Sequence, residues 1–276
     1  MEQILSCPVC ASPLSCEEKR YVCPHGHSFD VAKQGYVNLL LSRGTGVHGD
    51  NALMIESRKR FLSKGYYASL ADALSAKIAK YANEDTTLLD VGCGEGYYTA
   101  HLREALKGKS NRIYAFDISK DAVRATAKRC LDTTLFVASA YEVPVLNGSV
   151  DIATLFFSPF CPDELLRVLA PNGILVMAYP GVEHLWGLKQ AIYDAPYKNR
   201  PEDTRIEGFT LLEEEMISKE IFLPDTETVM ELFAMTPYYY KTGEKDKAKL
   251  ASLPSLTTEI QFHLCVYRKN YNTEQA

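Results

Sequence analysis

Four residues near the N-terminus have the types and the spacing of zinc ligands. Cys7 and Cys10 form a C-x2-C pair, and after twelve intervening residues Cys23 is followed by two histidines. Zinc ribbons enclose their ion with two thiolates in one tight turn and two further ligands in a second turn, joined by a short hairpin. We therefore expect Cys7, Cys10 and Cys23 to bind the ion, with His27 as the fourth ligand because its C-x3-H spacing lets the chain curl.

Two other side chains compete for the fourth ligand position. His25 lies only two residues from Cys23, and Cys16 lies in the middle of the expected hairpin. A redox dithiol or free thiols are alternative interpretations of a lone C-x2-C pair, but here a second pair follows at finger spacing. We predict one structural zinc ion in a small module that depends on the metal to fold, because the module has few apolar residues.

A glycine-rich turn in the middle of the chain has the features of a nucleoside-binding site. The run Asp90-Val-Gly-Cys-Gly-Glu-Gly96 follows an apolar strand and precedes a helix. Its glycines, Gly92, Gly94 and Gly96, let a ligand approach the backbone. The G-x-G-x-G spacing differs from the G-x-G-x-x-G of dinucleotide-binding turns. Glu95 would repel a pyrophosphate, but it suits a ligand with a cationic amino-acid end, such as S-adenosylmethionine.

Two further positions support a nucleoside ligand. Asp117 lies 21 residues after Gly96, at the end of the next expected strand, where a carboxylate reaches ribose hydroxyls. Ser139 and Ala140 follow the third strand, where an adenine edge is usually bound. Asp117 alone is also compatible with NAD, whereas the acid in the glycine turn favours S-adenosylmethionine.

The chain around these residues alternates between strand and helix patterns, which indicates an α/β domain. Two helices precede it, one from residue 52 until Gly65 and one at 68–81. The α/β body has strands at 86–91, 112–117, 135–139, 150–157 and 174–178, separated by helices at 97–106, 119–129 and 163–169. A mixed region follows, with helices at 184–192 and 225–235 and strands at 209–222 and 256–267.

The composition limits the class of protein. The 276 residues are 46% hydrophobic, and no apolar run is long enough to span a membrane. The N-terminus has no basic flank and no long apolar core, so we expect a cytoplasmic protein. The net charge of −5 argues against a broad nucleic-acid binder. Residues 42–51 contain three glycines and read as a mobile loop, for which a plain linker is the simpler interpretation.

A local run of basic residues is the exception to this acidic balance. Arg58, Lys59, Arg60 and Lys64 lie on the first expected helix, and we expect them to contact RNA phosphates. The alternative is a solvated helix face, which is the commoner origin of such a run.

The motifs, taken in order, resemble those of class I S-adenosylmethionine-dependent methyltransferases. The matching segments are Asp90–Gly96, Asp117, Ser139–Ala140, Val150–Asp151 and Leu169–Gly173. With the front of the chain included, the sequence closely resembles the 23S rRNA (guanine-N1)-methyltransferases, which are zinc-ribbon enzymes that modify a hairpin loop of domain II. The segments that narrow the resemblance are Gly35–Leu40, Gly49–Met54, Arg58–Leu62 and Pro180–Leu185. The family has two branches that modify neighbouring guanines, and one of them is linked to macrolide resistance.

This resemblance implies a Rossmann-like class I methyltransferase fold with a seven-stranded mixed sheet and an N-terminal zinc ribbon. It implies three regions, which are an RNA-recognition module at 1–40, a mobile loop with a helical linker at 41–85, and a methyltransferase domain at 86–276. It adds Tyr67 and His184 as cofactor contacts. The expected S-adenosylmethionine site is then Tyr67, Asp90, Gly92, Gly94, Glu95, Gly96, Asp117, Ile118, Ala140 and His184. The expected partner is a 23S rRNA hairpin loop, and a homodimer is an open alternative.

No residue identifies itself as the base that removes the N1 proton of guanine. Asp163, Glu164 and His184 are candidates. Cys161 invites a cytosine-C5 mechanism, but it lacks the Pro-Cys pair of that chemistry, and the Asx-Pro-Pro-aromatic loop of N6-adenine methylases is absent from the segment after Phe157. Two competing functions are a small-molecule methyltransferase and a non-catalytic zinc-ribbon protein that binds RNA.

Overall fold

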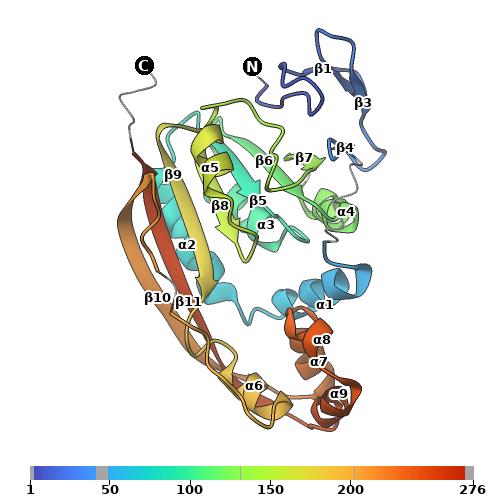
Figure 1. Cartoon of the computed structure of the whole chain (residues 1–276), viewed down its shortest axis with the longest axis vertical. Helices are drawn as coiled ribbons and strands as arrows, with labels where there is room; N and C mark the ends of the chain where they lie inside the picture. The colour runs from blue at the N-terminus through green and yellow to red at the C-terminus, as the bar shows by residue number, and fades with distance from the viewer. Residues whose placement is uncertain (1–2, 42–48, 131, 202, 271–276) are drawn as a thin grey trace.

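The computed structural model describes residues 3–41, 49–130, 132–201 and 203–270 (Figure 1). Most of the loop expected at 42–51 lies outside these residues, since only Gly49, Asp50 and Asn51 are described. None of the helices in the described residues is long and apolar enough to cross a membrane.

The body of the protein is an eight-stranded mixed sheet. Its spatial order is β10-β11-β9-β8-β5-β6-β7-β4. The strands from β9 to β4 run parallel, whereas β11 is antiparallel to both β9 and β10. Their bounds are β4 (Tyr36–Asn38), β5 (Thr87–Val91), β6 (Arg112–Asp117), β7 (Thr134–Val137), β8 (Val150–Phe156), β9 (Leu169–Pro180), β10 (Phe209–Leu223) and β11 (Leu256–Lys269).

The sheet therefore has eight strands, one more than the seven that we expected. The additional strand is β4, which follows the zinc ribbon and pairs in parallel with β7 at the edge of the sheet. Tyr36 and Val37 are buried there, so the segment covers a sheet edge that would otherwise expose unpaired backbone groups. The expectation was wrong because a three-residue strand carries almost no periodic signal in the sequence.

The central strand β5 is buried on both faces, as expected for a strand inside a parallel sheet. Its successive side chains point to opposite faces. Leu88 belongs to a core formed with helices α2 (Ala68–Tyr81) and α3 (Tyr97–Ala105). Leu89 belongs to a second core formed with helix α5 (Pro162–Val168) and the N-terminal module. Helix α4 (Lys120–Arg129) packs near the β7 edge.

The N-terminal module is a three-stranded antiparallel sheet of β1 (Ser15–Glu17), β2 (Arg20–Val22) and β3 (Ser28–Asp30). It is not an independent domain, because its buried residues share a core with one face of the large sheet. Leu5 forms an antiparallel bridge with Val145, and both side chains are fully buried. The module is thereby fixed to the body of the protein.

The last third of the chain builds a lobe below the sheet (Figure 1). The long strands β9, β10 and β11 extend into this lobe, which holds α6 (Trp186–Ile192), α7 (Thr226–Ala234), α8 (Tyr238–Lys241) and α9 (Glu244–Ala251). Helix α1 (Ala52–Ser63) packs against α7 and also contacts α3 and α4. It therefore joins the lobe to the body, and the cavity described below lies between them.

Candidate metal centre and cofactor pocket

The structure brings the four expected zinc ligands together. The ligand atoms of Cys7, Cys10, Cys23 and His27 all lie within 4.8 Å of one another. His27 Nδ1 is 3.6 Å from Cys7 Sγ and 3.3 Å from Cys23 Sγ, and the Sγ atoms of Cys10 and Cys23 are 3.7 Å apart. Bond lengths of about 2.1–2.3 Å to a tetrahedral zinc ion require ligand atoms at roughly these separations. The donor set therefore fits zinc.

The competing ligands lie outside this group. His25 Nδ1 is 3.1 Å from Ser12 Oγ and 3.5 Å from Cys10 Sγ, on the exposed side of the cluster. Cys16 is exposed on β1. His27 is the better fourth ligand because only its ring nitrogen lies close to all three thiols.

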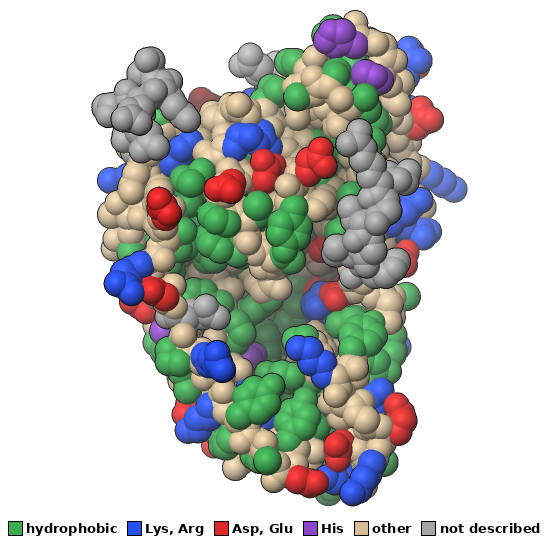
Figure 2. Space-filling view, in the orientation of Figure 1, with side chains coloured by type: hydrophobic (Ala, Val, Ile, Leu, Met, Phe, Trp, Pro, Cys, Tyr) green, Lys and Arg blue, Asp and Glu red, His purple; other side chains and the backbone are tan. Residues whose placement is uncertain are grey.

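A cavity of about 600 Å³ lies at the carboxyl ends of the parallel strands (Figure 2). This edge of a doubly wound sheet is where ligands usually bind. Eight of the ten expected cofactor residues line it, namely Tyr67, Gly92, Gly94, Glu95, Asp117, Ile118, Ala140 and His184. Residues from α1, from the loops after β7 and β8, and from α8 complete the wall.

The glycine turn owes its shape to left-handed backbone. Gly92, Gly94 and Gly96 have φ angles of 75°, 56° and 83°, which favour glycine. A Cβ on Gly92 would lie 1.7 Å from Ser158 Oγ, in the loop after β8. The first glycine is therefore needed for packing between two loops, in addition to any contact with a ligand.

Asp117 holds the turn together from the end of β6. Its Oδ2 accepts a hydrogen bond from Gly94 N (3.0 Å), and its Oδ1 accepts one from Ser119 N (2.8 Å). Burial raises the pKa of this carboxyl above its ordinary value. The Gly94 N–H is thus bound to Asp117 and does not point freely at a ligand, whereas the carboxylate keeps further lone pairs for one.

Two expected cofactor residues do not line the cavity. Asp90 is buried beneath the turn, where its carboxylate accepts hydrogen bonds from Thr99 Oγ1 (2.5 Å) and Thr154 Oγ1 (2.9 Å). Gly96 packs against α4, and a Cβ there would lie 2.9 Å from Thr126 Cγ2. Both residues support the turn from beneath, and their spacing in the sequence did not show that they face away from the cavity.

Burial of Asp90 makes a testable contribution to stability. Burial raises the pKa of Asp90 from 3.8 to about 6. Proton binding therefore favours the folded state, fully below pH 4, and this contribution is lost as the pH rises through 6. We expect Asp90→Asn to remove it, so that the difference in free energy of unfolding between wild type and variant changes by about 1–2 kcal/mol between pH 5 and pH 8. Parallel urea-unfolding profiles across this range would contradict the assignment.

Glu95 is the least satisfied polar group of the pocket. It is 2% exposed, and neither carboxylate oxygen receives a well-aligned hydrogen bond from the described residues, although the backbone N–H of Tyr97 is close enough to lower its pKa. Arg129 Nη2 lies 3.1 Å from Oε2, but without the alignment of a hydrogen bond. Burial raises the pKa of this carboxyl, against the opposing effect of Arg129 and Arg58. A buried acceptor without a donor is costly, and a bound ammonium group would satisfy it.

Tyr67 and His184 lie side by side on the opposite wall. Both are buried, and each contacts Phe262, with ring centroids 4.9 Å and 4.7 Å away. His184 Nδ1 accepts a hydrogen bond from Gln261 N, and burial lowers the pKa of His184 to about 3. The ring is therefore neutral with its proton on Nε2, which makes it a hydrogen-bond donor and excludes it as the general base.

The other candidate bases lie outside the cavity. Glu164 accepts hydrogen bonds from Arg167 and from Val143 N, and Asp163 does not line the cavity. Cys161 begins α5 and does not line it either, which removes the thiol nucleophile of a cytosine-C5 mechanism. The carboxylates that do line it are Asp50, Glu95 and Asp117.

The basic run on α1 is not the free phosphate-binding surface that we expected. Carboxylates from distant parts of the chain neutralise it. Lys64 Nζ lies 2.6 Å from Glu231 Oε2, and Arg60 pairs with both Glu56 and Glu227. Lys59 is exposed and lies 3.9 Å from Glu56. The fourth cation, Arg58, points into the cavity.

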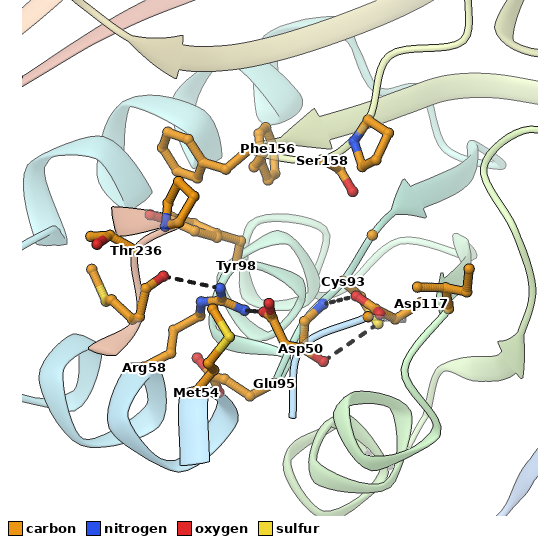
Figure 3. A pocket seen from close by; sticks show the side chains of 18 of the residues that line it. Asp50, Met54, Arg58, Cys93, Glu95, Tyr98, Asp117, Phe156, Ser158 and Thr236 are labelled. Atoms are coloured by element: carbon orange, nitrogen blue, oxygen red, sulfur yellow. Dashed lines mark hydrogen bonds and ion pairs between the residues drawn. The ribbon is translucent and has the colours of Figure 1, made fainter. Parts of the chain in front are cut away.

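Arg58 lines the cavity, a position that differs from the phosphate contact that we expected from the sequence (Figure 3). Its guanidinium pairs with Asp50 and donates to Met235 O (3.4 Å). Nη1 also lies 3.5 Å from the position of a Cβ on Gly94, so the cation sits against the glycine turn. Helical periodicity places Arg58 on α1 but does not show that α1 crosses the cavity.

Comparison with known proteins agrees with this geometry. Residues 5–41 match the zinc-ribbon family described as RlmA, N-terminal, and residues 88–173 match a methyltransferase domain. The chain is 30% identical over 272 residues to the 23S rRNA (guanine(748)-N(1))-methyltransferase of Streptomyces fradiae, covering 95% of this chain and 96% of that protein.

Two further relatives carry provisional names for the same type of enzyme, a 23S rRNA (guanine-N(1)-)-methyltransferase. A Micromonospora griseorubida protein is 33% identical and covers 66% of this chain and 67% of its own length. A Bacillus subtilis (strain 168) protein is 31% identical and covers 74% of each. With a zinc ribbon, a class I methyltransferase fold and this similarity along nearly its whole length, the chain belongs to the family of 23S rRNA (guanine-N1)-methyltransferases.

Proposed function

We propose that the protein transfers a methyl group from S-adenosylmethionine to N1 of a guanine in a hairpin loop of domain II of 23S rRNA. The observation that carries this proposal is the union, in one rigidly packed chain, of a Cys3His ribbon with a pocket that presents an unsatisfied Glu95 beside a left-handed glycine turn. The relative from Streptomyces fradiae, which aligns over both parts, is named for N1 methylation of a 23S rRNA guanine.

The amino-acid end of the cofactor is proposed to lie between two charged groups. Glu95 accepts the ammonium group, which provides the donor that its buried oxygens lack. Arg58 takes the carboxylate, because its guanidinium lies against Gly94 at the same end of the pocket. Asp50 occupies Arg58 in the structure and acts as an internal substitute for this carboxylate. A carboxylate and a guanidinium side by side favour a ligand that carries both an ammonium and a carboxylate group over a ligand that carries a phosphate.

The nucleoside end is proposed to lie along the ends of β6 and β7. Asp117 accepts from ribose hydroxyls with the lone pairs that Gly94 and Ser119 leave free. Ile118 and Ala140, which both follow Asp117 in the sequence, line the cavity and contact the adenine. Tyr67 and His184 close the opposite wall.

The cofactor supplies an electrophilic methyl group on a sulfonium sulfur, so the protein mainly orients the acceptor. As the N1–CH3 bond forms and the S–CH3 bond breaks, the N1 proton passes to solvent water. Its loss places negative charge on guanine O6, and a hydrogen-bond donor there stabilises the transition state. Tyr98 is a suitable donor, since its buried hydroxyl has no partner among the described residues and burial raises its pKa well above the ordinary value. Its ring lies 5.3 Å from that of Phe156, and both residues line the cavity. We place the target guanine against these two rings and call this part of the cavity the acceptor side.

The division of labour among the regions is also a proposal. Residues 1–40 recognise RNA, 41–85 link the module to the body and contribute Arg58 and Tyr67 to the cofactor pocket, and 86–276 supply the rest of that pocket and carry out methyl transfer in the cytoplasm. Since the ribbon shares its core with the large sheet, the ribbon and the methyltransferase domain present one rigid surface to the RNA. A homodimer would extend this surface.

The direct test is methyl transfer by the purified protein. Transcripts of the domain II hairpin are incubated with S-adenosylmethionine, and the nucleosides are analysed by mass spectrometry. We expect 1-methylguanosine, and none from a transcript in which the loop guanines are replaced by adenine. A methylated base other than 1-methylguanosine, or no transfer to RNA, would contradict the proposal and favour a small-molecule methyltransferase or a non-catalytic RNA-binding protein.

A further inference from the structure

Aromatic side chains gather at the mouth of the cavity. Among the described residues, six large aromatic side chains are exposed, and three of these, Tyr141, Phe157 and Tyr240, line the cavity. They come from the loop after β7, the loop after β8 and α8, so their convergence is created by the fold and not by sequence proximity. We define these three residues as the aromatic rim. The space-filling view shows hydrophobic groups around the hollow (Figure 2).

The rings of Tyr240 and Phe157 have contacts that hold them in position, whereas Tyr141 is fixed through its backbone. Tyr240 Oη receives a hydrogen bond of 2.6 Å from the side chain of Asn51, the residue that caps α1. Phe157 has a left-handed φ of 58°, which is strained for a residue other than glycine and is concentrated at functional sites. Its ring lies 5.6 Å from that of Phe262. Tyr141 N donates to Ser139 Oγ. Fixed rings lose little conformational entropy when a ligand stacks on them.

The charge distribution leaves stacking as the main contact available to RNA at this mouth. The cations of α1 are paired with carboxylates, and Arg58 faces inward. Lys241, which follows Tyr240, is exposed and has no ion pair with any residue that the structure describes. Proteins bind single-stranded loops by stacking unpaired bases on aromatic rings beside a positively charged groove that follows the backbone. Because the cations of α1 are paired at this mouth, we expect stacking to contribute the larger share here.

From these observations we infer that the aromatic rim is a second RNA-binding surface beside the ribbon and that it stacks on unpaired bases of the hairpin loop at the mouth of the cavity. Phe157, which is next to the acceptor side of the pocket, contacts the target guanine, and Tyr141 and Tyr240 contact its neighbours. This inference rests on the proposed function, because it assumes that an RNA loop is the substrate. It replaces the basic helix as the principal contact at the mouth of the cavity.

The test measures binding of a fluorescently labelled domain II hairpin to the intact protein. We expect Tyr141→Ala and Tyr240→Ala each to weaken hairpin binding by about fivefold or more, while the affinity for S-adenosylhomocysteine stays unchanged. The matched control is Phe222→Ala. Phe222 on β10 is 59% exposed, which is close to the 61% of Tyr240, but it does not line the cavity. Tyr240→Phe keeps the ring but loses the hydrogen bond from Asn51, so its affinity for the hairpin should lie between those of wild type and Tyr240→Ala.

Salt dependence separates stacking from phosphate binding. We expect the slope of log K against log salt concentration to be no steeper than about −2, which corresponds to about three phosphate contacts with a single strand. A fully paired duplex of equal length should bind much more weakly than the hairpin. If wild type methylates the hairpin but the rim variants bind it normally, or if the slope is about −5 or steeper, the inference is wrong while the proposed function stands. If wild type neither binds nor methylates the hairpin, both are wrong.

Discussion

Replacement of Arg58 by alanine is expected to lower the affinity for S-adenosylhomocysteine by about 10- to 100-fold, because a hydrogen bond to a charged group contributes about 1.5–3 kcal/mol. The affinity for 5′-methylthioadenosine should not change, since this ligand has the nucleoside and the sulfur but no amino-acid carboxylate. Calorimetric titration of both ligands into the same variant provides the comparison. The two ligands together isolate the carboxylate contact from any general damage to the pocket.

Two other variants sharpen this prediction. Lys59→Ala removes the neighbouring cation, which is exposed and has only a 3.9 Å pair with Glu56, and it should bind both ligands like wild type. Asp50→Asn should strengthen binding of S-adenosylhomocysteine, because it removes the carboxylate that pairs with Arg58. Equal losses for both ligands in Arg58→Ala would show that the residue only supports the fold.

Replacement of Cys7 by serine is expected to remove the metal and unfold the ribbon. Binding of a structural zinc ion contributes about 10–16 kcal/mol to the folding of small zinc modules, and Cys7 is one of the four converging ligands. The zinc content measured by metal analysis should therefore fall from one ion per chain to none, and RNA methylation should be lost. Binding of S-adenosylhomocysteine should persist, because the residues that line the cavity begin at Gly49 and include none from the ribbon.

The control for the metal is Cys16→Ser. This thiol is exposed on β1 and lies outside the ligand group, so the variant should keep its zinc and its activity. Retention of a full zinc complement by Cys7→Ser, or its loss in Cys16→Ser, would contradict the ligand assignment.

The sequence predicted the parts of the molecule whose residues are close together in the chain. The zinc ligands fall in two short turns, and the structure places their donor atoms together. The strand, glycine turn and helix around Gly94 also form a local unit, in which a change from apolar run to glycine to helical periodicity is readable. Asp117 was within reach because the length of a βαβ unit restricts where the second strand ends.

Contacts between distant segments were not predictable in this way. The basic run on α1 looked free because its partners, Glu227 and Glu231, lie more than 160 residues away in the sequence. Arg58 lines the cavity only because α1 packs against α7. The role of Asp90 was also hidden, since its partner Thr154 is on a different strand.

Methylation of a hairpin-loop guanine at N1 can be seen directly in a primer-extension map of 23S rRNA from cells with and without the protein. A methyl group on guanine N1 blocks Watson–Crick pairing and stops reverse transcriptase. We expect one stop at a guanine in the domain II hairpin loop, present with the wild-type protein and absent in the deletion strain. Identical maps from the two strains, or a protein-dependent stop only outside this loop, would contradict it.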